Sequence, residues 1–137
     1  MNVQDIMTAE PIVIQHDLPI IEALALMQES NVRHLPVLEG KKLIGMISDR
    51  DLRSVYASST VDEHALLGLA KQFRAPVSKI MASDVVLIQP EAELSEALDL
   101  ILEQSVGALP VVDPISDNLV GILSYVDVLR AVREYLP

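Results

Sequence analysis

The sequence predicts a mixed α/β (α+β) fold built from two copies of a strand–helix–strand–strand–helix unit. Three observations predict it: an internal repeat, short apolar runs typical of buried strands, and apolar residues at helical spacing. The chain has 137 residues, about the size of one ordinary domain. We therefore expect both copies to form a single module, without room for an accessory domain.

The internal repeat appears when the sequence is shifted by 74 residues, which carries Val3 onto Val77. Further along the shift becomes 76 and carries Gly45 onto Gly121, because residues 39–42 are replaced by the longer turn 113–118. A single length difference placed in a turn is what a true duplication is expected to show. The sequence therefore predicts the same order of elements in both copies.

Each copy is predicted to contain three strands and two helices. In the first copy the strands are residues 12–14, 35–38 and 43–47, and the second helix begins near residue 49. In the second copy they are 85–88, 109–112 and 119–123, with a helix from about residue 126. Asp17 and Glu91 stand near the start of the first helices, where a carboxylate complements free N–H groups. Gly40 and Asp113-Pro114 supply turn residues for the two hairpins.

A linker helix is predicted between the copies. Thr60-Val61-Asp62-Glu63 has the form of a capping box. Apolar residues then follow at helical spacing, ended by Pro76: Leu66, Leu69, Ala70 and Phe73. The chain thus divides into copy one (1–59), the linker helix (60–76) and copy two (77–137). The linker helix either covers the core or contacts an effector.

Composition narrows the classes of partner and compartment. The formal net charge of -10 argues against nucleic acid or an anionic membrane as the main partner, although local cations can still bind an anionic small ligand. No apolar run reaches the roughly 18–20 residues of a membrane span, and we expect no signal peptide, because the first residues lack its basic start and apolar centre. With no cysteine, disulfides and thiolate metal sites are excluded. We expect a cytoplasmic protein.

Three motifs occur twice in the same order: Val-x-x-Ile-Met, Leu-Pro-Val, and an apolar strand ending in Gly-x-x-Ser-x-x-Asp. This ordered set resembles a tandem pair of CBS domains (a Bateman module), and the resemblance runs from Val3 to about Leu136. It implies a stand-alone pair whose repeats pack sheet to sheet and leave two clefts. It also implies that the clefts bind adenosine compounds, such as AMP, ADP, ATP or S-adenosylmethionine, and that pairs form a homodimer through their helices.

The end of each ordered set places a Ser and an Asp at the start of a predicted helix: Ser48 with Asp51, and Ser124 with Asp127. An ionised carboxylate can accept hydrogen bonds from both adjacent hydroxyls of a ribose. The Ser hydroxyls and the N–H groups of the helix N-terminus can take a phosphate. Ser and Asp are also ordinary helix caps, so each junction either contacts a ligand or only caps its helix.

The resemblance implies that the ribose-binding Asp of one repeat faces a base pocket supplied largely by the other. Besides Asp51 and Ser48, the expected ligand-binding residues are Met46, Arg50, Arg33, His34, Ala82, Val86, Leu87, Val106, Gly107, Ala108 and Pro110. Among them, the cations would bind phosphate, and the small residues at 107 and 108 would leave room for a flat purine held by apolar contact.

The cations of this expected site also have simpler interpretations. Arg50 and Arg53 can pair with Asp49 on the helix surface, where ion pairs are common and weak. His34 can be an ordinary residue at the end of a strand. The other histidines have no partners at metal-ligand spacing, so no metal site is expected.

The equivalent site at Asp127 is predicted to be weaker. Its other expected members are Ser124, Ile122, Ile12 and Val13. Bulky Arg33 and His34 stand where the first base slot has Gly and Ala, and Val126 replaces Arg50 on the phosphate side. We therefore expect one competent site, at Asp51, and a second that is weak or empty.

The resemblance implies a regulatory module that senses an adenine nucleotide and is read by an effector protein through a change in packing or in the dimer. No obligatory cofactor is expected. The alternatives are a structural or dimerisation module with empty clefts, and a sensor of another adenosyl ligand such as S-adenosylmethionine. The chain lacks the phosphate-loop, nucleophile-elbow and zinc-protease motifs and has no cysteine, so we do not expect an enzyme.

Overall fold

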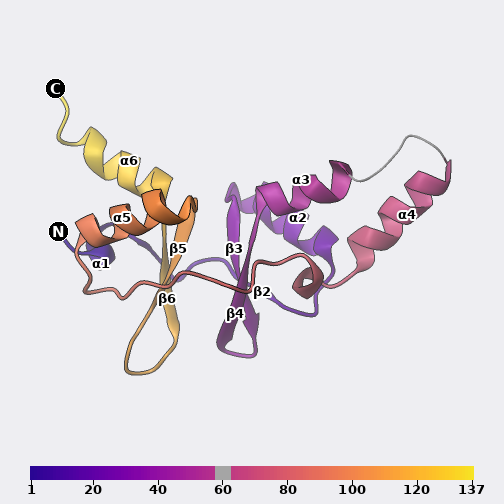
Figure 1. Ribbon diagram of the computed structural model, residues 1–137, viewed down its shortest axis with the longest axis horizontal. Helices are drawn as coiled ribbons and strands as arrows, with labels where there is room; N and C mark the ends of the chain where they lie inside the picture. Colours follow the sequence, from indigo (N-terminus) through magenta and orange to yellow (C-terminus); the bar gives the residue numbers. More distant parts are fainter. Residues whose placement is uncertain (58–62) are drawn as a thin grey trace. The chain divides into compact units, whose positions relative to one another are not determined.

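The computed structural model of the chain describes residues 1–57 and 63–137, and residues 60–62 of the predicted capping box therefore lie outside the described residues. The chain forms two compact units (Figure 1). Unit 1 contains Met1–Pro11 and Val85–Pro137, and unit 2 contains Ile12–Asp84. Each unit has one three-stranded sheet with helices packed against it, which confirms the mixed α/β class.

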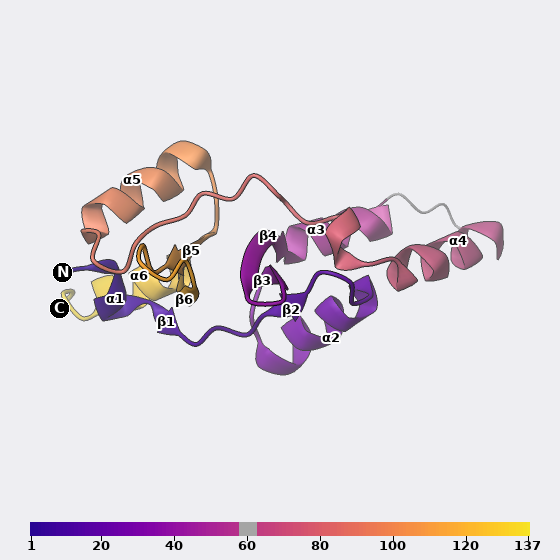
Figure 2. The same cartoon turned by 90° about the horizontal axis from the view of Figure 1, so that it is seen from below.

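Unit 2 contains the first hairpin and the helices around it. Its sheet has the order β2-β3-β4, with β2 parallel to β3 and β3 antiparallel to β4. The elements are β2 (Ile14–Gln15), α2 (Ile20–Ser30), β3 (His34–Glu39), β4 (Lys42–Ser48), α3 (Asp49–Ala57), α4 (Glu63–Arg74) and the 3-10 helix η1 (Val77–Lys79). Both views show α2 and α3 beside β3 and β4 (Figure 2).

Unit 1 is built around the second hairpin, but its third strand pairs with the second hairpin strand instead of the first. Its sheet has the order β1-β6-β5, with both pairs antiparallel. The elements are α1 (Val3–Ile6), β1 (Thr8–Ala9), α5 (Leu94–Gln104), β5 (Ala108–Val112), β6 (Leu119–Ser124) and α6 (Tyr125–Arg133). The hairpin strands and second helices of both units begin within one residue of their predicted positions, so these predictions are confirmed.

The compact units cut across the sequence repeat, because the segment that begins each repeat packs in the other unit. Val3 of the first repeat donates its N–H to the carbonyl of Ala92 at 2.9 Å, inside unit 1. Val77 of the second repeat donates to the carbonyl of Leu18 at 2.9 Å, inside unit 2. Both valine side chains are fully buried. Each core is therefore completed by residues from the other repeat.

The same exchanged segments replace the expected carboxylate caps of the first helices. The first N–H of α2, at Ile20, donates to the carbonyl of Ala75 at 2.9 Å, and that of α5 donates to Met1 at 3.0 Å. The N-cap residues are Pro19 and Glu93, and neither makes a side-chain capping bond. Asp17 and Glu91 lie near the helix starts, as predicted, but neither is the N-cap residue, and one free N–H of each helix is satisfied by a backbone carbonyl instead.

The first strand of each repeat is shorter than predicted. In unit 2 it begins at Ile14 instead of Ile12, and in unit 1 it is reduced to a single bridge between Ile88 and Val111. The reason is the exchange of segments: the chain passes from unit 1 to unit 2 at residues 11–12, and back at 84–85. Residues in these passages reach a pairing partner only a few positions later.

Close packing of the exchanged segment requires a glycine in β4. A Cβ atom added at Gly45 would lie 2.5 Å from Sδ of Met81 and 2.9 Å from the carbonyl oxygen of Ala82. Met81 belongs to the segment that crosses β4 at the Met46–Ala82 bridge. Hydrogen alone at residue 45 leaves space for this crossing.

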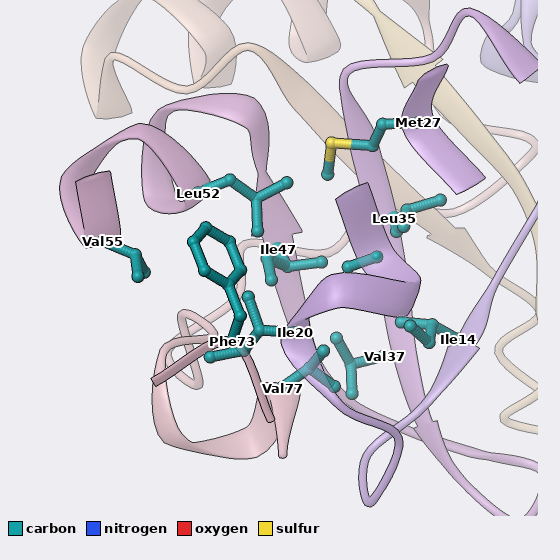
Figure 3. Close-up of a cluster of buried hydrophobic side chains, with 11 residues drawn as sticks. Ile14, Ile20, Met27, Leu35, Val37, Ile47, Leu52, Val55, Phe73 and Val77 are labelled. Atoms are coloured by element: carbon teal, nitrogen blue, oxygen red, sulfur yellow. The ribbon is translucent and has the colours of Figure 1, made fainter. Parts of the chain in front are cut away.

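The core of unit 2 is aliphatic apart from one aromatic residue (Figure 3). Its buried members are Ile14, Ile20, Ala23, Met27, Leu35, Val37, Ile47, Leu52, Val55, Phe73 and Val77. Phe73 comes from α4 and lies 5.0 Å from the ring of Tyr56. The linker helix therefore covers the core of unit 2. No helix in the described ranges has the length and apolarity needed to cross a bilayer.

Candidate functional site

The Asp51 site begins with a reciprocal cap where β4 runs into α3. The Ser48 N–H donates to Oδ2 of Asp51 at 2.8 Å, and the Asp51 N–H donates to Oγ of Ser48 at 3.2 Å. This arrangement satisfies one donor of the strand end and one of the helix start. The capping interpretation of the Ser-x-x-Asp motif is therefore confirmed.

The cap uses only one of the two oxygens of Asp51. Oδ2 accepts from both the N–H and, at 3.1 Å, the hydroxyl of Ser48. Oδ1 accepts no hydrogen bond from any residue in the described part of the chain, and the side chain is half-buried. Capping and ligand binding by Asp51 are compatible, because a ligand can use the second oxygen.

His34 lies next to this cap as the first residue of β3, opposite Ser48 in the sheet. Burial lowers the pKa of His34 from its ordinary 6.5, although the charges of Asp49 and Asp51 act in the opposite direction. The neutral form of the imidazole therefore predominates at pH 7. His34 stands at a strand end, as one interpretation predicted, and it offers a phosphate a hydrogen-bond donor instead of a full charge.

The arginines around Asp51 fall into two groups. Arg53 pairs with Asp49 along α3, with Nη2 to Oδ2 at 2.7 Å. Burial would raise the pKa of Asp49, but the hydrogen bond and charge of Arg53 outweigh this and lower it. Arg33 and Arg50 are exposed and form no ion pair with the residues that the structure describes. These two guanidinium groups are available to an anionic ligand.

The remaining expected members of the site belong to both units. Ala82 lies beside the Asp51 junction in unit 2, because it exchanges backbone hydrogen bonds of 2.9 and 2.8 Å with Met46. The other members belong to unit 1, and their contribution to an Asp51 site stays a prediction: Val86, Leu87, Val106, Gly107, Ala108 and Pro110. Within unit 1, Gly107 accepts the Tyr125 N–H at 3.1 Å.

The Asp127 junction has the same cap but an additional contact. Oδ2 of Asp127 accepts from the Ser124 N–H at 2.9 Å and from its hydroxyl at 3.1 Å. Oδ1 accepts from the hydroxyl of Thr8 at 3.2 Å, and Asp127 is only 9% exposed. Thr8 lies on β1, which pairs with β6 and places Thr8 opposite Ile122. The other expected members, Ile12 and Val13, belong to unit 2.

Thr8 is the site residue that sequence reasoning missed. The signal was present, since the repeat shift of 74 carries Thr8 onto Ala82, a residue already assigned to the first site. A threonine in one copy and an alanine in the other means that one carboxylate gains a hydroxyl neighbour and the other does not.

Comparison with known proteins supports a common architecture. The family model of the CBS domain matches residues 3–58 and 77–134. The CBS domain-containing protein YhcV of Bacillus subtilis is 32% identical over 126 residues, covering 92% of this chain and 81% of that protein. The crystal structure of CBSX2 in complex with AMP has a TM-score of 0.79 and 28% identity, covering 98% of this chain and 97% of that one.

Other similarities are narrower in what they imply. The CBS domain pair of MJ0100, solved with 5′-methylthioadenosine and S-adenosylmethionine, has a TM-score of 0.81 at 22% identity, so it shows the fold alone. Inosine-5′-monophosphate dehydrogenase of Thermoplasma acidophilum is 28% identical, but the match spans only 23% of that enzyme. The chain belongs to the CBS domain family and carries two copies of the domain, one in each matched range.

Proposed function

We propose that this chain is a regulatory module that binds an adenine nucleotide at Asp51. The observation that carries the proposal is Oδ1 of Asp51, which accepts no hydrogen bond within the described part of the chain. Arg50, beside Asp51 in sequence, and Arg33, beside His34, are exposed and form no ion pair with the described residues. The AMP complex of CBSX2 supports the ligand class, because that protein matches nearly the whole chain.

In the proposed complex the two ribose hydroxyls donate to Asp51, while the phosphate and the base of the ligand contact separate groups of residues. Arg33 and Arg50 compensate phosphate charge, and His34 donates from its neutral ring. Val86, Leu87, Val106, Gly107, Ala108 and Pro110 remain the predicted contacts of the base. The ligand regulates only if it binds two arrangements of the protein with different affinities.

The proposed readout is a change in packing or in a homodimer that an unidentified effector protein recognises. Apolar side chains exposed on α5 and α6 support such an association, with Leu102 76% and Leu129 61% exposed. If no adenosyl compound binds, the exposed helices would instead favour the purely structural or dimerisation function. S-adenosylmethionine remains the alternative adenosyl ligand.

Thermal unfolding in the presence of AMP, ADP, ATP or S-adenosylmethionine tests the proposal. A ligand present at 100 times its dissociation constant stabilises the folded state by about 2.7 kcal/mol. We expect AMP, ADP or ATP to raise the unfolding temperature and Asp51→Ala to abolish this increase. A larger increase with S-adenosylmethionine would favour the alternative ligand.

Asp127→Ala is the matched control, because it removes the same type of cap from the other unit. Either substitution should cost about 1 kcal/mol of stability through the lost cap. Only Asp51→Ala should also remove the response to ligand. An equal response in the wild type and in Asp51→Ala would contradict the assignment to Asp51, and no response to any compound would contradict nucleotide sensing.

A further inference from the structure

The aspartates of the two junctions differ in their remaining capacity to accept hydrogen bonds. Each carboxylate oxygen has two lone pairs. In both aspartates, the Ser N–H and Ser hydroxyl use both lone pairs of Oδ2. Asp51 retains both on Oδ1, judged against the residues that the structure describes. Asp127 retains one, because Thr8 donates to its Oδ1. Two ribose hydroxyls can therefore be accepted by Asp51 and not by Asp127.

The difference arises from one position of the repeat. Thr8 lies opposite Ile122 in the sheet of unit 1, and Ala82 lies opposite Met46 in unit 2. Ile122 and Met46 are themselves equivalent, since the repeat shift beyond the hairpin turn is 76. The side chains of residues 8 and 82 thus stand at the same place relative to the neighbouring carboxylate. An alanine there has no group that can donate to Asp51.

We propose that the residue at this position decides which carboxylate accepts a ribose. The Thr8 hydroxyl donates to Oδ1 of Asp127 and so prevents this carboxylate from accepting both hydroxyls of a vicinal diol. Ala82 has no such donor, so Asp51 can accept both. This inference rests on the proposed function and adds to it a residue that sets the number of sites. A ribose at Asp127 would have to displace the hydroxyl of Thr8. This displacement should weaken binding of the ligand about tenfold, the effect typical of losing one hydrogen bond to a charged group.

Exchanging the side chains at the two positions tests the proposal, with AMP as the probe in isothermal titration calorimetry. In an Asp51→Ala background only the Asp127 site remains, and Thr8→Val should strengthen its binding of AMP about tenfold or more. Valine keeps the shape of threonine and removes the hydroxyl. Thr8→Ser is the matched control, because it retains the hydroxyl and should give no gain.

The reverse exchange uses the other site. In an Asp127→Ala background, Ala82→Thr should weaken the binding of AMP at Asp51 about tenfold, and Ala82→Ser should weaken it similarly. Ala82→Val is the control for added volume and should leave the affinity closer to that of the parent. Amide hydrogen exchange of each variant verifies that its unit is folded.

The outcomes separate this inference from the function on which it rests. If AMP binds at Asp51 but neither exchange changes affinity, the role of residues 8 and 82 is overturned and the proposed function stands. If AMP fails to bind the wild type but binds Asp127 after Thr8→Val, the role of Thr8 is supported and the Asp51 assignment is overturned. Absence of binding in every variant overturns both.

Discussion

At the scale of single residues, His34 connects the proposed site to pH. It is half-buried at the start of β3, and the charged groups around it are Asp49, Asp51 and Arg33. Burial is the largest influence and keeps the pKa below 6.5, so the two carboxylates compensate only part of the cost of a buried positive charge. Protonation of His34 is therefore less favourable in the folded chain than in the unfolded one.

This imbalance predicts that unit 2 loses stability when the pH falls below about 6.5. In that range the unfolded chain binds a proton at His34 that the folded chain does not, so the free energy of unfolding decreases until the pH passes the lower folded pKa. Denaturant unfolding between about pH 8 and about pH 5 measures the decrease. We expect the decrease to be smaller in His34→Gln, which remains neutral throughout.

The comparison with His34→Gln isolates this residue because the other histidines are unchanged. The lowered pKa of Asp49 acts elsewhere: its stabilising contribution is present above the ordinary value of 3.8 and is lost only as the pH falls through the lower folded value. Parallel pH profiles for wild type and variant would show that burial does not disfavour the protonated His34.

At the scale of elements, the exchanged segments contribute one buried valine to each core. Val3 begins the first repeat in sequence but is 0% exposed in unit 1, and Val77 begins the second repeat but is 0% exposed in unit 2. The stability of each unit should therefore depend on a buried valine that belongs in sequence to the repeat whose hairpin forms the other unit.

Val3→Ala should destabilise unit 1 by about 2 kcal/mol, from two lost methyl groups and the cavity that they leave. Val77→Ala should destabilise unit 2 by a similar amount. Amide hydrogen exchange locates the effect: Val3→Ala should reduce protection in β5 and β6, and Val77→Ala should reduce it in β3 and β4.

The two substitutions serve as controls for each other. Loss of protection in β3 and β4 after Val3→Ala, with β5 and β6 unchanged, would mean that the first segment packs with its own repeat. Equal loss in all four strands after either substitution would indicate that the units open together, contrary to the division into two compact units.

The elements also show which parts of the fold the sequence could predict. The hairpins β3–β4 and β5–β6 are local and strongly patterned, and their predicted bounds lie within one residue of the observed ones. The helices α1 and η1 have only four and three residues, too few to show a helical period. The exchange of segments depends on contacts distant in sequence, for which no local pattern exists.

The same distinction applies to the candidate site. The Ser-x-x-Asp cap is a local motif, and its hydrogen bonds in both units agree with the predicted capping role. The contact between Thr8 and Asp127 joins residues 119 positions apart, so no local motif reveals it, and only the repeat shift that carries Thr8 onto Ala82 pointed to this position. The expected joint contribution of both repeats to one base pocket stays a prediction.

At the scale of the whole molecule, the helices α5 and α6 each expose a leucine side chain. Leu102 of α5 is 76% exposed and Leu129 of α6 is 61% exposed. The formal net charge of -10 favours solubility, whereas these exposed leucines do not contribute to it. Burial of these side chains against a second copy would recover the apolar free energy that the isolated chain leaves unused.

We therefore predict that the chain sediments as a dimer, with twice its mass of 15.0 kDa. The double substitution Leu102→Glu and Leu129→Glu should shift the sedimenting species toward the monomer mass of 15.0 kDa. Glutamate on this face adds charge to an apolar contact and repels the same residue of an opposing copy. Ile115→Glu is the control, since Ile115 is 95% exposed in the β5–β6 turn, outside the helices. Sedimentation equilibrium distinguishes the states. A wild type of 15.0 kDa at all concentrations, or a dimer that survives the double substitution and dissociates with Ile115→Glu, would exclude association through α5 and α6.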